Sequence, residues 1–360
     1  MSEYRTIINS ALDAIGGILI MTTHGIFVIS LDFELNWGVH DVFTLEQYEE
    51  NLSGTPEAID KMLELFNNLG IRATWATVGM LFFKNKKELL DNIPSLLPTY
   101  TNSSFSPYEK LATIGENEEQ DPFHFGQSLL KKIAEYAGQE ISTHTFSHYY
   151  CLEEGQTAEQ FEADLKASIK VNKEFGYPVK SIVFPRNQLN KTYLPICKKY
   201  GIESYRGNEK SWIYEGSQFY KESLFRRMLR LADCYVNITG HHTYQLKRVM
   251  QEPIINLPSS RFLRPFNSKM KSFERLRLRR IKKSIIHAAQ NGEVYHLWWH
   301  PHNFGKDTEE NMQFLKQILE LVARLNKEYD FESLTMGEAT NLALQLKEEK
   351  AYEKTPPVTL

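Results

Sequence analysis

The sequence predicts an α/β fold in which parallel strands and helices alternate along most of the chain. Three observations predict it. Short, almost continuously apolar runs such as residues 25–31 are typical of strands that are buried on both faces. Stretches with apolar residues at helical spacing follow these runs, and chemically active side chains stand where several of the strands end. The alternation favours a sheet that is closed into a barrel or doubly wound.

The elements can be placed in order. The first strand is expected over residues 25–31 and ends at Asp32. The helix expected over Thr55–Leu69 has Pro56 in its first turn and Gly70 directly after its last residue, which are typical start and stop signals. The further strands are expected at 71–78, 139–143, 181–184 and 293–299, and the further helices at 79–90, 125–136, 158–175, 192–200 and 309–326.

Three segments do not follow this alternation. Residues 1–22 are expected to be an N-terminal lead-in, and 346–360 a flexible, polar C-terminal tail. Residues from about 207 to 290 are expected to form an insertion, which contains the strongly basic stretch Lys269–Lys283. The remainder, within 23–345, is expected to be a single barrel domain, because barrels of strands and helices reach this length as one unit.

Composition excludes several classes of protein. The chain has 42 basic and 45 acidic residues and a net charge of -3, so no overall field draws it onto nucleic acid. Its three cysteines are too few and too scattered for a disulfide framework and suit a reducing compartment. The apolar run within Leu12–Met21 is too short to span a bilayer and lacks the features of a signal peptide. We therefore expect a cytoplasmic protein.

Two carboxylates stand at the end of the first expected strand. Asp32 and Glu34 are two residues apart, so both side chains can project toward the same side of an extended chain. One could bind a metal ion while the other stays free. Taken alone, such a pair is more often simply two solvated acids, so the motif needs support from other residues.

His144 and His148 give that support. The spacing H-x-x-x-H places both imidazoles on one face of a helical turn, at a separation that suits a shared metal ion. The alternative is a pair of surface histidines. The expected strand ending at Thr143 favours the metal site, because it delivers His144 to the same end of the sheet as the carboxylates. Two histidines and one carboxylate are typical of a catalytic metal site.

Two more candidates follow expected strands. His300 comes directly after Trp299, and histidine, whose ordinary pKa lies near neutrality, suits proton transfer. For His302 we favour a supporting or surface position. Arg186 could pair with Asp32, contact substrate or form a structural salt bridge, and the sequence leaves these three open.

Taken in chain order, these segments resemble the polysaccharide deacetylase (NodB-homology) family. The ordered set is Ser30–Glu34, Ala73–Gly79, His144–His148, Phe184–Arg186 and Leu297–Pro301. The resemblance implies a distorted (β/α)7 barrel with insertions that hydrolyses the acetamide of an N-acetylated sugar. It also implies a divalent metal, most often zinc, which polarises the amide carbonyl and makes water more acidic.

The resemblance implies a role for each matching residue. Asp32 would be the catalytic base, His300 the general acid, and Arg186 the residue that orients the base. The metal ligands would be Glu34, His144 and His148. The sequence departs from the commonest family pattern, which has two adjacent aspartates where this chain has Asp32-Phe33-Glu34.

The substrate is predicted only as a class. Trp37, Tyr149 and Trp299 lie near the motifs and could stack on sugar rings. A cytoplasmic location favours a nucleotide-linked or lipid-linked saccharide precursor of a surface polysaccharide or O-antigen, and Lys269–Lys283 could contact the inner face of the membrane. The alternatives are an allantoinase-like amidohydrolase, a non-catalytic carbohydrate-binding relative, and a scaffold protein.

Overall fold

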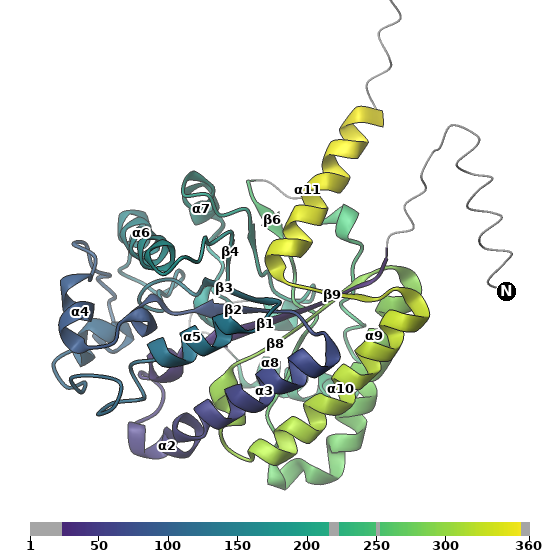
Figure 1. The fold of residues 1–360 in the computed structure, drawn as a ribbon, viewed down its shortest axis with the longest axis horizontal. Coiled ribbons are helices and arrows are strands. Elements are labelled where there is room, and N and C mark those ends of the chain that lie inside the picture. Colours follow the sequence, from purple (N-terminus) through teal and green to yellow (C-terminus); the bar gives the residue numbers. More distant parts are fainter. Residues whose placement is uncertain (1–23, 216–222, 250–252, 354–360) are drawn as a thin grey trace, which may run out of the picture.

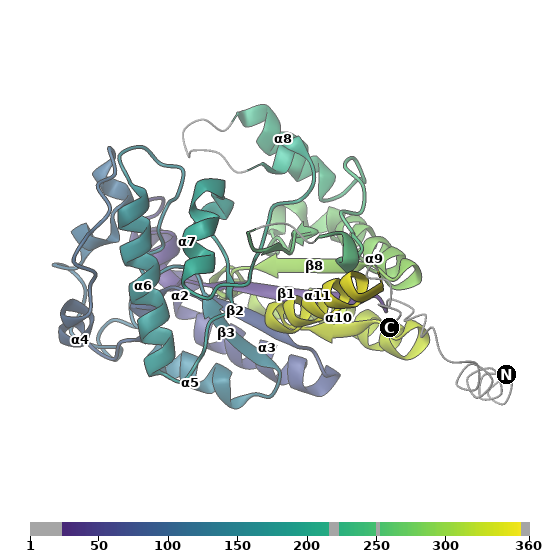
Figure 2. The ribbon, with the colours of Figure 1, turned by 90° about the horizontal axis from the view of Figure 1, so that it is seen from above.

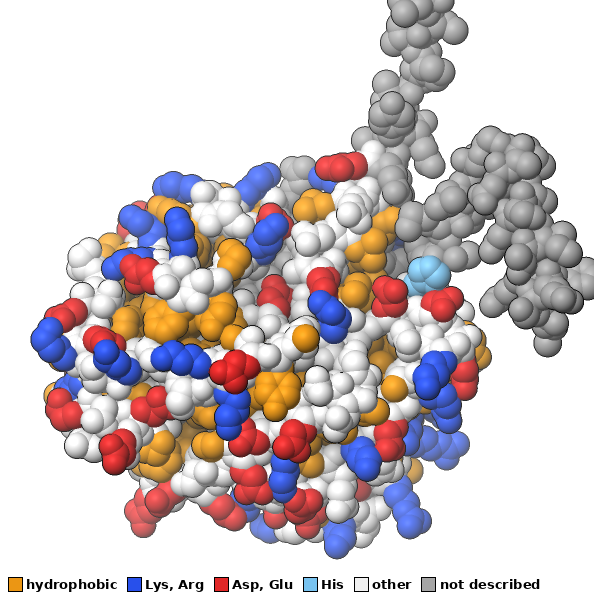
Figure 3. Space-filling model, viewed as in Figure 1, with side chains coloured by type: hydrophobic (Ala, Val, Ile, Leu, Met, Phe, Trp, Pro, Cys, Tyr) orange, Lys and Arg blue, Asp and Glu red, His pale blue; other side chains and the backbone are white. Residues whose placement is uncertain are grey.

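A curled sheet of parallel strands, surrounded by helices, forms the body of the protein (Figures 1 and 2). The structure, a computed structural model, describes residues 24–215, 223–249 and 253–353. No helix in these ranges is both long enough and apolar enough to cross a membrane. On the face shown in Figure 3, acidic and basic side chains are interspersed rather than gathered by sign.

The sheet has nine strands, in the order β6-β5-β4-β3-β2-β1-β8-β7, with β9 also paired to β1. The strands are β1 Ile26–Phe33, β2 Ala73–Thr77, β3 Gln139–Thr143, β4 Ser181–Ile182, β5 Ser204–Tyr205, β6 Ile255–Asn256, β7 Arg261–Phe262, β8 Val294–Trp299 and β9 Glu332–Leu334. β1 lies in the middle and pairs in parallel with β8 from Ile26 opposite Val294 to Leu31 opposite Trp299. Every residue of β1 is buried, as its apolar sequence predicts.

The segment between β6 and β7 bonds to both edges of the sheet and so closes it. Leu257 N–H donates to the carbonyl of Tyr205 beyond β6, whereas Ser260 N–H, three residues later, donates to the carbonyl of His296 in β8. β6 and β7 therefore act as two halves of one position. Counted in this way, the path from β6 to β7 has seven positions, and the predicted (β/α)7 barrel is confirmed.

The helices cover the outside and one end of the barrel. They are α2 Leu45–Ser53, α3 Thr55–Leu69, α4 Lys86–Asp91, α5 Gln127–Glu135, α6 Ala158–Glu174, α7 Leu194–Lys199, α8 Leu224–Asp233, α9 Glu274–Asn291, α10 Thr308–Tyr329 and α11 Met336–Glu353. α3, α9 and α10 pack together on one side of the sheet (Figure 1). Their apolar faces and the outward side chains of β1, such as Phe27 and Leu31, form the largest core cluster.

α11 closes the end of the barrel where the strands begin. Met336 N–H donates to the hydroxyl of Thr74 in β2, and the hydroxyl of Thr340 donates to that of Ser204 in β5. Gly337 N–H donates to the carboxyl group of Glu140 in β3. The opposite end, where the strands finish, is left for the loops that carry the predicted site residues.

The expected insertion and tail need correction. Residues 207–290 contain β6, β7 and nearly all of α9, so much of this region belongs to the barrel, and the elaboration is limited to the part around α8. The expected tail 346–360 begins inside α11, which extends to Glu353. Strands of two residues carry no readable period, which is why the sequence did not reveal β6 and β7. The expected lead-in, 1–22, lies outside the described residues.

Candidate active site

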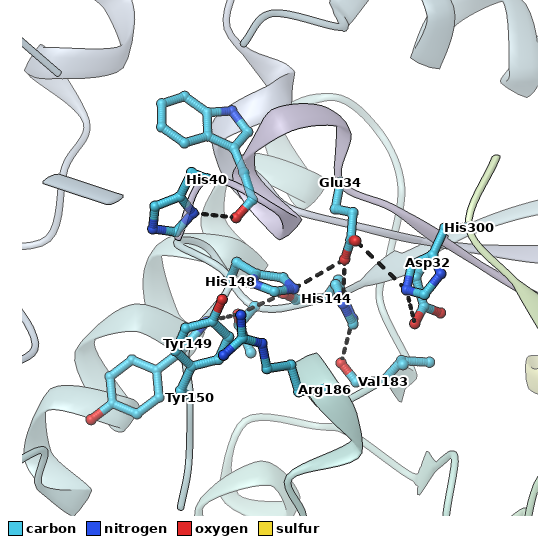
Figure 4. A network of polar contacts seen from close by, with 12 residues as sticks. Asp32, Glu34, His40, His144, His148, Tyr149, Tyr150, Val183, Arg186 and His300 are labelled. Carbon is cyan, nitrogen blue, oxygen red and sulfur yellow. Dashed lines mark hydrogen bonds and ion pairs between the residues drawn. The ribbon is translucent and has the colours of Figure 1, made fainter. Parts of the chain in front are cut away.

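Five of the predicted site residues meet at the carboxyl ends of the strands (Figure 4). Asp32 and Glu34 come from the end of β1, His144 and His148 from the loop after β3, and His300 from the end of β8. The strands are parallel, so their carboxyl ends lie at the same edge of the sheet. β3, β2, β1 and β8 are neighbours in that order, which brings these side chains to one place. The predicted convergence is confirmed.

Glu34, His144 and His148 form a compact group that could hold a metal ion. One carboxylate oxygen, Glu34 Oε2, lies 3.2 Å from His144 Nε2 and 3.0 Å from His148 Nε2. All three side chains are buried, and the three candidate ligand atoms lie within 4.8 Å of one another. Within the described ranges, this is the one group of three or more such side chains that could hold an ion.

The environment of the group fits a divalent cation. His144 Nδ1 donates to the carbonyl of Val183 at 2.8 Å, which fixes the tautomer and leaves the lone pair of Nε2 facing Glu34 (Figure 4). Neither that nitrogen nor Glu34 Oε2 has a hydrogen bond of acceptable geometry to any described residue. Buried polar atoms are normally paired, so two facing, unpaired ligand atoms suit an ion between them.

The pKa values of Glu34 and His148 also favour binding of a metal ion. Burial by itself would raise the pKa of Glu34, but the surrounding histidines, His300 and His148 foremost, outweigh it and hold this pKa well below its ordinary value. Burial lowers the pKa of His148 to about 4, against the opposing pull of Glu34. At neutral pH the group therefore offers a charged carboxylate and a neutral imidazole, the forms that bind metal.

The H-x-x-x-H segment is not helical, which corrects the expectation from its spacing. It is an irregular loop in which Thr145 and His148 have φ values of 65° and 56°. Positive φ is rare for residues other than glycine, above all for a β-branched threonine, and such strain gathers at functional sites. Five of the eight described non-glycine residues with positive φ lie in the segments that follow β1, β3 and β4 around this site: Leu35, Thr145, His148, Arg186 and Asn187.

A glycine makes room for the longer carboxylate. A Cβ atom at Gly38 would lie 2.0 Å from the carboxyl group of Glu34, so the glutamate side chain occupies the space that a larger residue would fill. Gly38 ends the short 3-10 helix Leu35–Gly38 that follows β1 directly. The glutamate of the D-x-E pattern therefore needs a glycine at position 38 to make space for its side chain.

Asp32 is held by Arg206 and not by Arg186. Arg206 donates from Nη1 and Nη2 to the two carboxylate oxygens of Asp32 at 2.6 and 2.8 Å, and both side chains are buried. Burial alone would raise the pKa of Asp32, but the charge and hydrogen bonds of Arg206, together with the nearby His144 and His300, outweigh it and leave this pKa below its ordinary value. Asp32 is therefore ionised at neutral pH. Arg206 follows β5 directly, but this strand of two residues gives no sequence signal from which the strand-end position could have been inferred.

Arg186 has a different partner. Its Nη2 donates to both carboxylate oxygens of Asp41, at 2.7 and 2.6 Å, and its guanidinium lies over the ring of Tyr150 (Figure 4). The expectation that Arg186 orients Asp32 is wrong, because this arginine is already engaged with Asp41. Arg186 still lines the cavity beside the site.

His300 faces both carboxylates. Its Nε2 lies 3.7 Å from Asp32 Oδ2 and 3.6 Å from Glu34 Oε1, and its side chain is 22% exposed. The ring of His302 stacks on it with centroids 5.2 Å apart, and His302 Nε2 lies 3.8 Å from Glu34 Oε1. His302 is buried and in contact with the site, which fits the supporting position and excludes the surface one.

Known proteins resemble this chain in part of its sequence and in its fold. Residues 51–205 match the family described as polysaccharide deacetylase. A putative polysaccharide deacetylase from Mycobacterium smegmatis has the same fold over 95% of this chain and 96% of its own, with a TM-score of 0.55 and 13% identity. A probable polysaccharide deacetylase from Pseudomonas aeruginosa PAO1 covers 89% of this chain and 90% of its own, with a TM-score of 0.50 and 10% identity. The chain therefore resembles polysaccharide deacetylases in the sequence of residues 51–205 and in its fold. No curated protein sequence matches it.

The range matched by the family covers only part of the candidate site. Residues 51–205 include His144, His148 and Arg186, whereas Asp32, Glu34, Arg206 and His300 lie outside the matched range. These outer residues reach the site through β1, β5 and β8, which pair within the same sheet. The site therefore depends on strands from both ends of the chain.

The three aromatic residues predicted to stack on sugar do not reach the cavity. Trp37, Tyr149 and Trp299 are each fully buried. Trp37 Nε1 donates to the carbonyl of His124, and Trp299 packs edge-on against Phe66 in the helix layer, so this expectation is wrong. Successive side chains of a strand point to opposite faces, and it is the neighbouring residue, Trp298, that lines the cavity.

A cavity of about 470 Å³ opens beside the candidate metal group. Glu34, His300 and His302 belong to its wall. The remainder comes from α2, β7, β8, the segments after β1, β4 and β5, and the region around α8. It includes Val39, Phe43, Tyr48, Arg186, Glu209, Tyr214, Arg230, Cys234, Arg261, Arg264 and Trp298. The cavity is large enough for a sugar and part of a linked group.

A buried aspartate of α6 holds the loop with the two histidines. Asp164 accepts hydrogen bonds from Phe146 N–H at 2.7 Å, from Ser147 N–H at 3.1 Å and from the Ser147 hydroxyl. Asp164→Ala would leave these donors unpaired in the core. We expect it to lower the free energy of unfolding by about 3–5 kcal/mol and to weaken metal binding, as measured by chemical denaturation and metal titration. Asp164→Asn, which keeps one acceptor, should lose less; an equal loss in both variants would contradict this.

The same aspartate gives a signature in the pH dependence of stability. Burial raises the pKa of Asp164 from 3.8 to about 6, and the hydrogen bonds from Ser147 and Phe146 only partly oppose it. Between about pH 4 and pH 6 the folded state therefore binds a proton more tightly than the unfolded chain. The contribution of this group to the free energy of unfolding should fall as pH rises through that window, and Asp164→Asn should remove this fall.

Proposed function

We propose that this protein is a metal-dependent N-deacetylase that removes the acetyl group from an N-acetylated sugar. One observation carries the proposal: a Glu-His-His group of buried ligands adjoins an ionised aspartate and a histidine whose facing atoms are 3.7 Å apart, beside a cavity. Amide hydrolysis needs a Lewis acid, a proton acceptor and a proton donor together. The Glu-His-His group would hold the Lewis acid, Asp32 would be the proton acceptor, and His300 would be the proton donor.

The side chains divide the proton transfers between them. A divalent cation at Glu34, His144 and His148 would polarise the acetamide carbonyl and make water more acidic. Asp32, kept charged by Arg206, accepts the proton of the attacking water. An amide nitrogen leaves readily only when it is protonated, and His300, partly exposed at the wall of the cavity, donates that proton. Arg206 also fixes the direction of the Asp32 oxygens.

Zinc is the metal that we propose. Two imidazole nitrogens and one carboxylate oxygen, with positions left for water and substrate, are typical of catalytic zinc sites. The backbone carbonyl of Val183 behind His144 is the kind of outer partner that orients a histidine ligand.

The substrate that we propose is a nucleotide-linked or lipid-linked saccharide precursor of a surface polysaccharide or O-antigen. Arginines supply much of the charge in the wall formed near α8 and β7. Arg261 is paired with Asp233, but Arg264 makes no ion pair with any residue in the described ranges. Its Nε donates to Cys234 Sγ at 3.2 Å. A guanidinium that no carboxylate in the described ranges neutralises favours a sugar that carries a phosphate or another anionic group.

Metal content tests this function first. Wild-type protein purified without added metal should contain close to one equivalent of zinc by elemental analysis, and His144→Ala and His148→Ala should both lose most of it. His287→Ala is the matched control, because His287 lies on α9 and pairs with Glu293 away from the site. The metal-loaded protein should release acetate from a nucleotide-linked N-acetylhexosamine, measured by an acetate assay.

Two results would overturn the proposal. Wild-type protein that binds no divalent metal even after reconstitution would exclude it. A metal-loaded protein that hydrolyses a cyclic ureide but releases no acetate from any acetylated sugar would move the assignment to the amidohydrolase alternative.

A further inference from the structure

Helix α8 presents its apolar side to the outside of the molecule. Leu224, Phe225 and Met228 are 73%, 63% and 68% exposed, and Leu231 is 39% exposed. Helical spacing places these four residues on one face. A helix on the surface of a soluble protein normally turns such a face toward the core, so the orientation of α8 is the reverse of the usual one. Figure 2 shows α8 at the edge of the molecule, beyond the body formed by the sheet.

The polar side of α8 attaches the helix to the rest of the protein. Arg226 Nη2 donates to the carbonyls of Trp212 and Glu215 at 2.9 and 2.7 Å, and Arg230 Nη1 donates to the carbonyl of Ile213 at 3.0 Å. Asp233, the one buried residue of α8, pairs with Arg261 at 2.9 Å. The inward direction of the polar side is therefore fixed by several bonds, which leaves the apolar side facing outward.

The apolar face continues onto the next helix layer. Tyr235, just after α8, contacts the ring of Phe273 edge-on at 5.8 Å. Phe273 and Leu276, at the junction of the 3-10 helix Ser268–Phe273 and α9, are each 45% exposed. The exposed Trp212 lies on the segment to which Arg226 is bonded. Together Leu224, Phe225, Met228, Leu231, Phe273 and Leu276 form what we term the α8 face.

Positive charge surrounds the α8 face. α8, the 3-10 helix Ser268–Phe273 and α9 together carry eleven Lys and Arg residues but only two acidic ones, Asp233 and Glu274. Both acids are bonded to arginines, Asp233 to Arg261 and Glu274 to Arg277. Within the basic stretch Lys269–Lys283, Arg277 and Arg280 are buried. Its exposed members are Lys269, Lys271, Arg275, Arg279 and Lys283.

We propose that the α8 face docks this protein on an anionic membrane surface. Exposed Leu, Phe and Met side chains enter the boundary between headgroups and acyl chains, and the surrounding Lys and Arg residues contact anionic headgroups. A second copy of the chain suits the face less well, because a two-fold contact would bring the same cationic groups together. The proposal is independent of the chemistry of the metal site, although α8 also supplies Arg230 and Cys234 to the cavity wall.

Vesicle flotation tests the apolar contribution. The full-length protein should float with vesicles of phosphatidylglycerol and phosphatidylcholine and far less with phosphatidylcholine alone. Leu224→Ser/Met228→Ser should weaken binding about tenfold or more. The matched control is Leu90→Ser/Leu96→Ser, which removes two leucines that are 42% and 43% exposed elsewhere on the surface. This control should bind like the wild type.

A second pair of variants tests the charges. Lys271→Glu/Arg275→Glu should weaken binding to anionic vesicles about tenfold or more, and added salt should weaken wild-type binding in the same direction. The control Lys173→Glu/Lys327→Glu makes the same change of net charge on α6 and α10. All four variants should retain metal and acetate release from a soluble substrate, so failure of docking and failure of the proposed chemistry give different results.

Three outcomes would overturn docking. The first is that the wild type does not float with anionic vesicles, and the second is that Leu224→Ser/Met228→Ser floats as well as the wild type. The third is that the wild type binds no vesicles but forms a dimer, and that Leu224→Ser/Met228→Ser dissociates this dimer. The last would assign the α8 face to a second copy of the chain.

Discussion

Asp32→Asn is expected to lower the turnover of an acetylated sugar by about 10²- to 10⁴-fold, with metal content close to that of the wild type. Asparagine fills the same space, and its amide oxygen can still accept a hydrogen bond from Arg206, but it cannot take a proton from water. The metal group does not include Asp32, so the ligands should stay in place. Steady-state kinetics and elemental analysis on the same preparation measure both quantities.

Asp41→Asn provides the matched control. Asp41 is buried and paired with Arg186 at 2.6 Å, much as Asp32 is paired with Arg206. Asparagine at either position removes one arginine-carboxylate ion pair from the same end of the barrel. A much larger loss of turnover at position 32 would therefore come from the proton transfer. Equal losses at the two positions would show that Asp32 acts only through structure.

His300→Ala is the second substitution with a large expected effect, again about 10²- to 10⁴-fold in turnover of an amide. The expected reason is that the leaving nitrogen loses its proton donor. An acetyl ester of a phenol has a leaving group that departs without protonation, so the variant should lose far less activity on such an ester. Comparison of the two substrates by steady-state kinetics measures the difference.

A small base can also test the position of His300. The side chain is 22% exposed and lines the cavity, so added imidazole can enter the space left in His300→Ala. Imidazole should restore part of the amide hydrolysis in this variant and none in Asp32→Asn. The role of His300 as proton donor would be refuted by identical losses on amide and ester together with no rescue.

The position of the site in the sheet was predictable because parallel strands end at one edge. Asp32 lies at the end of β1, and His144 and His300 directly follow β3 and β8, which were all expected as strands, so their convergence could be inferred before any contact was known. The (β/α)7 architecture came from the family resemblance and not from counting strands. β4, β5, β6 and β7 have only two residues each, too few to show a period, and this is why Arg206 after β5 was missed.

Other errors arose because the sequence alone does not show which face of the sheet a side chain points to, or how a loop is shaped. Residues adjacent along a strand point to opposite faces, and nothing in the sequence showed that Trp298 and not Trp299 would line the cavity. The spacing of His144 and His148 suits a helix, but the loop reaches the same closeness through positive φ at Thr145 and His148. Asp164, which holds that loop, comes from the following helix, and no local pattern relates the two.

The placement of α11 constrains the order in which the chain can fold during synthesis. Residues 336–340 come after all nine strands in the chain, yet they supply the bonds to Thr74, Glu140 and Ser204 that cover the start of β2, β3 and β5. Until then Glu140, a carboxylic acid whose pKa burial raises in the finished protein, remains in contact with water. A nascent chain can pair its early strands, but it cannot seal the barrel until α11 has been synthesised, so completion of this domain has to wait for that helix.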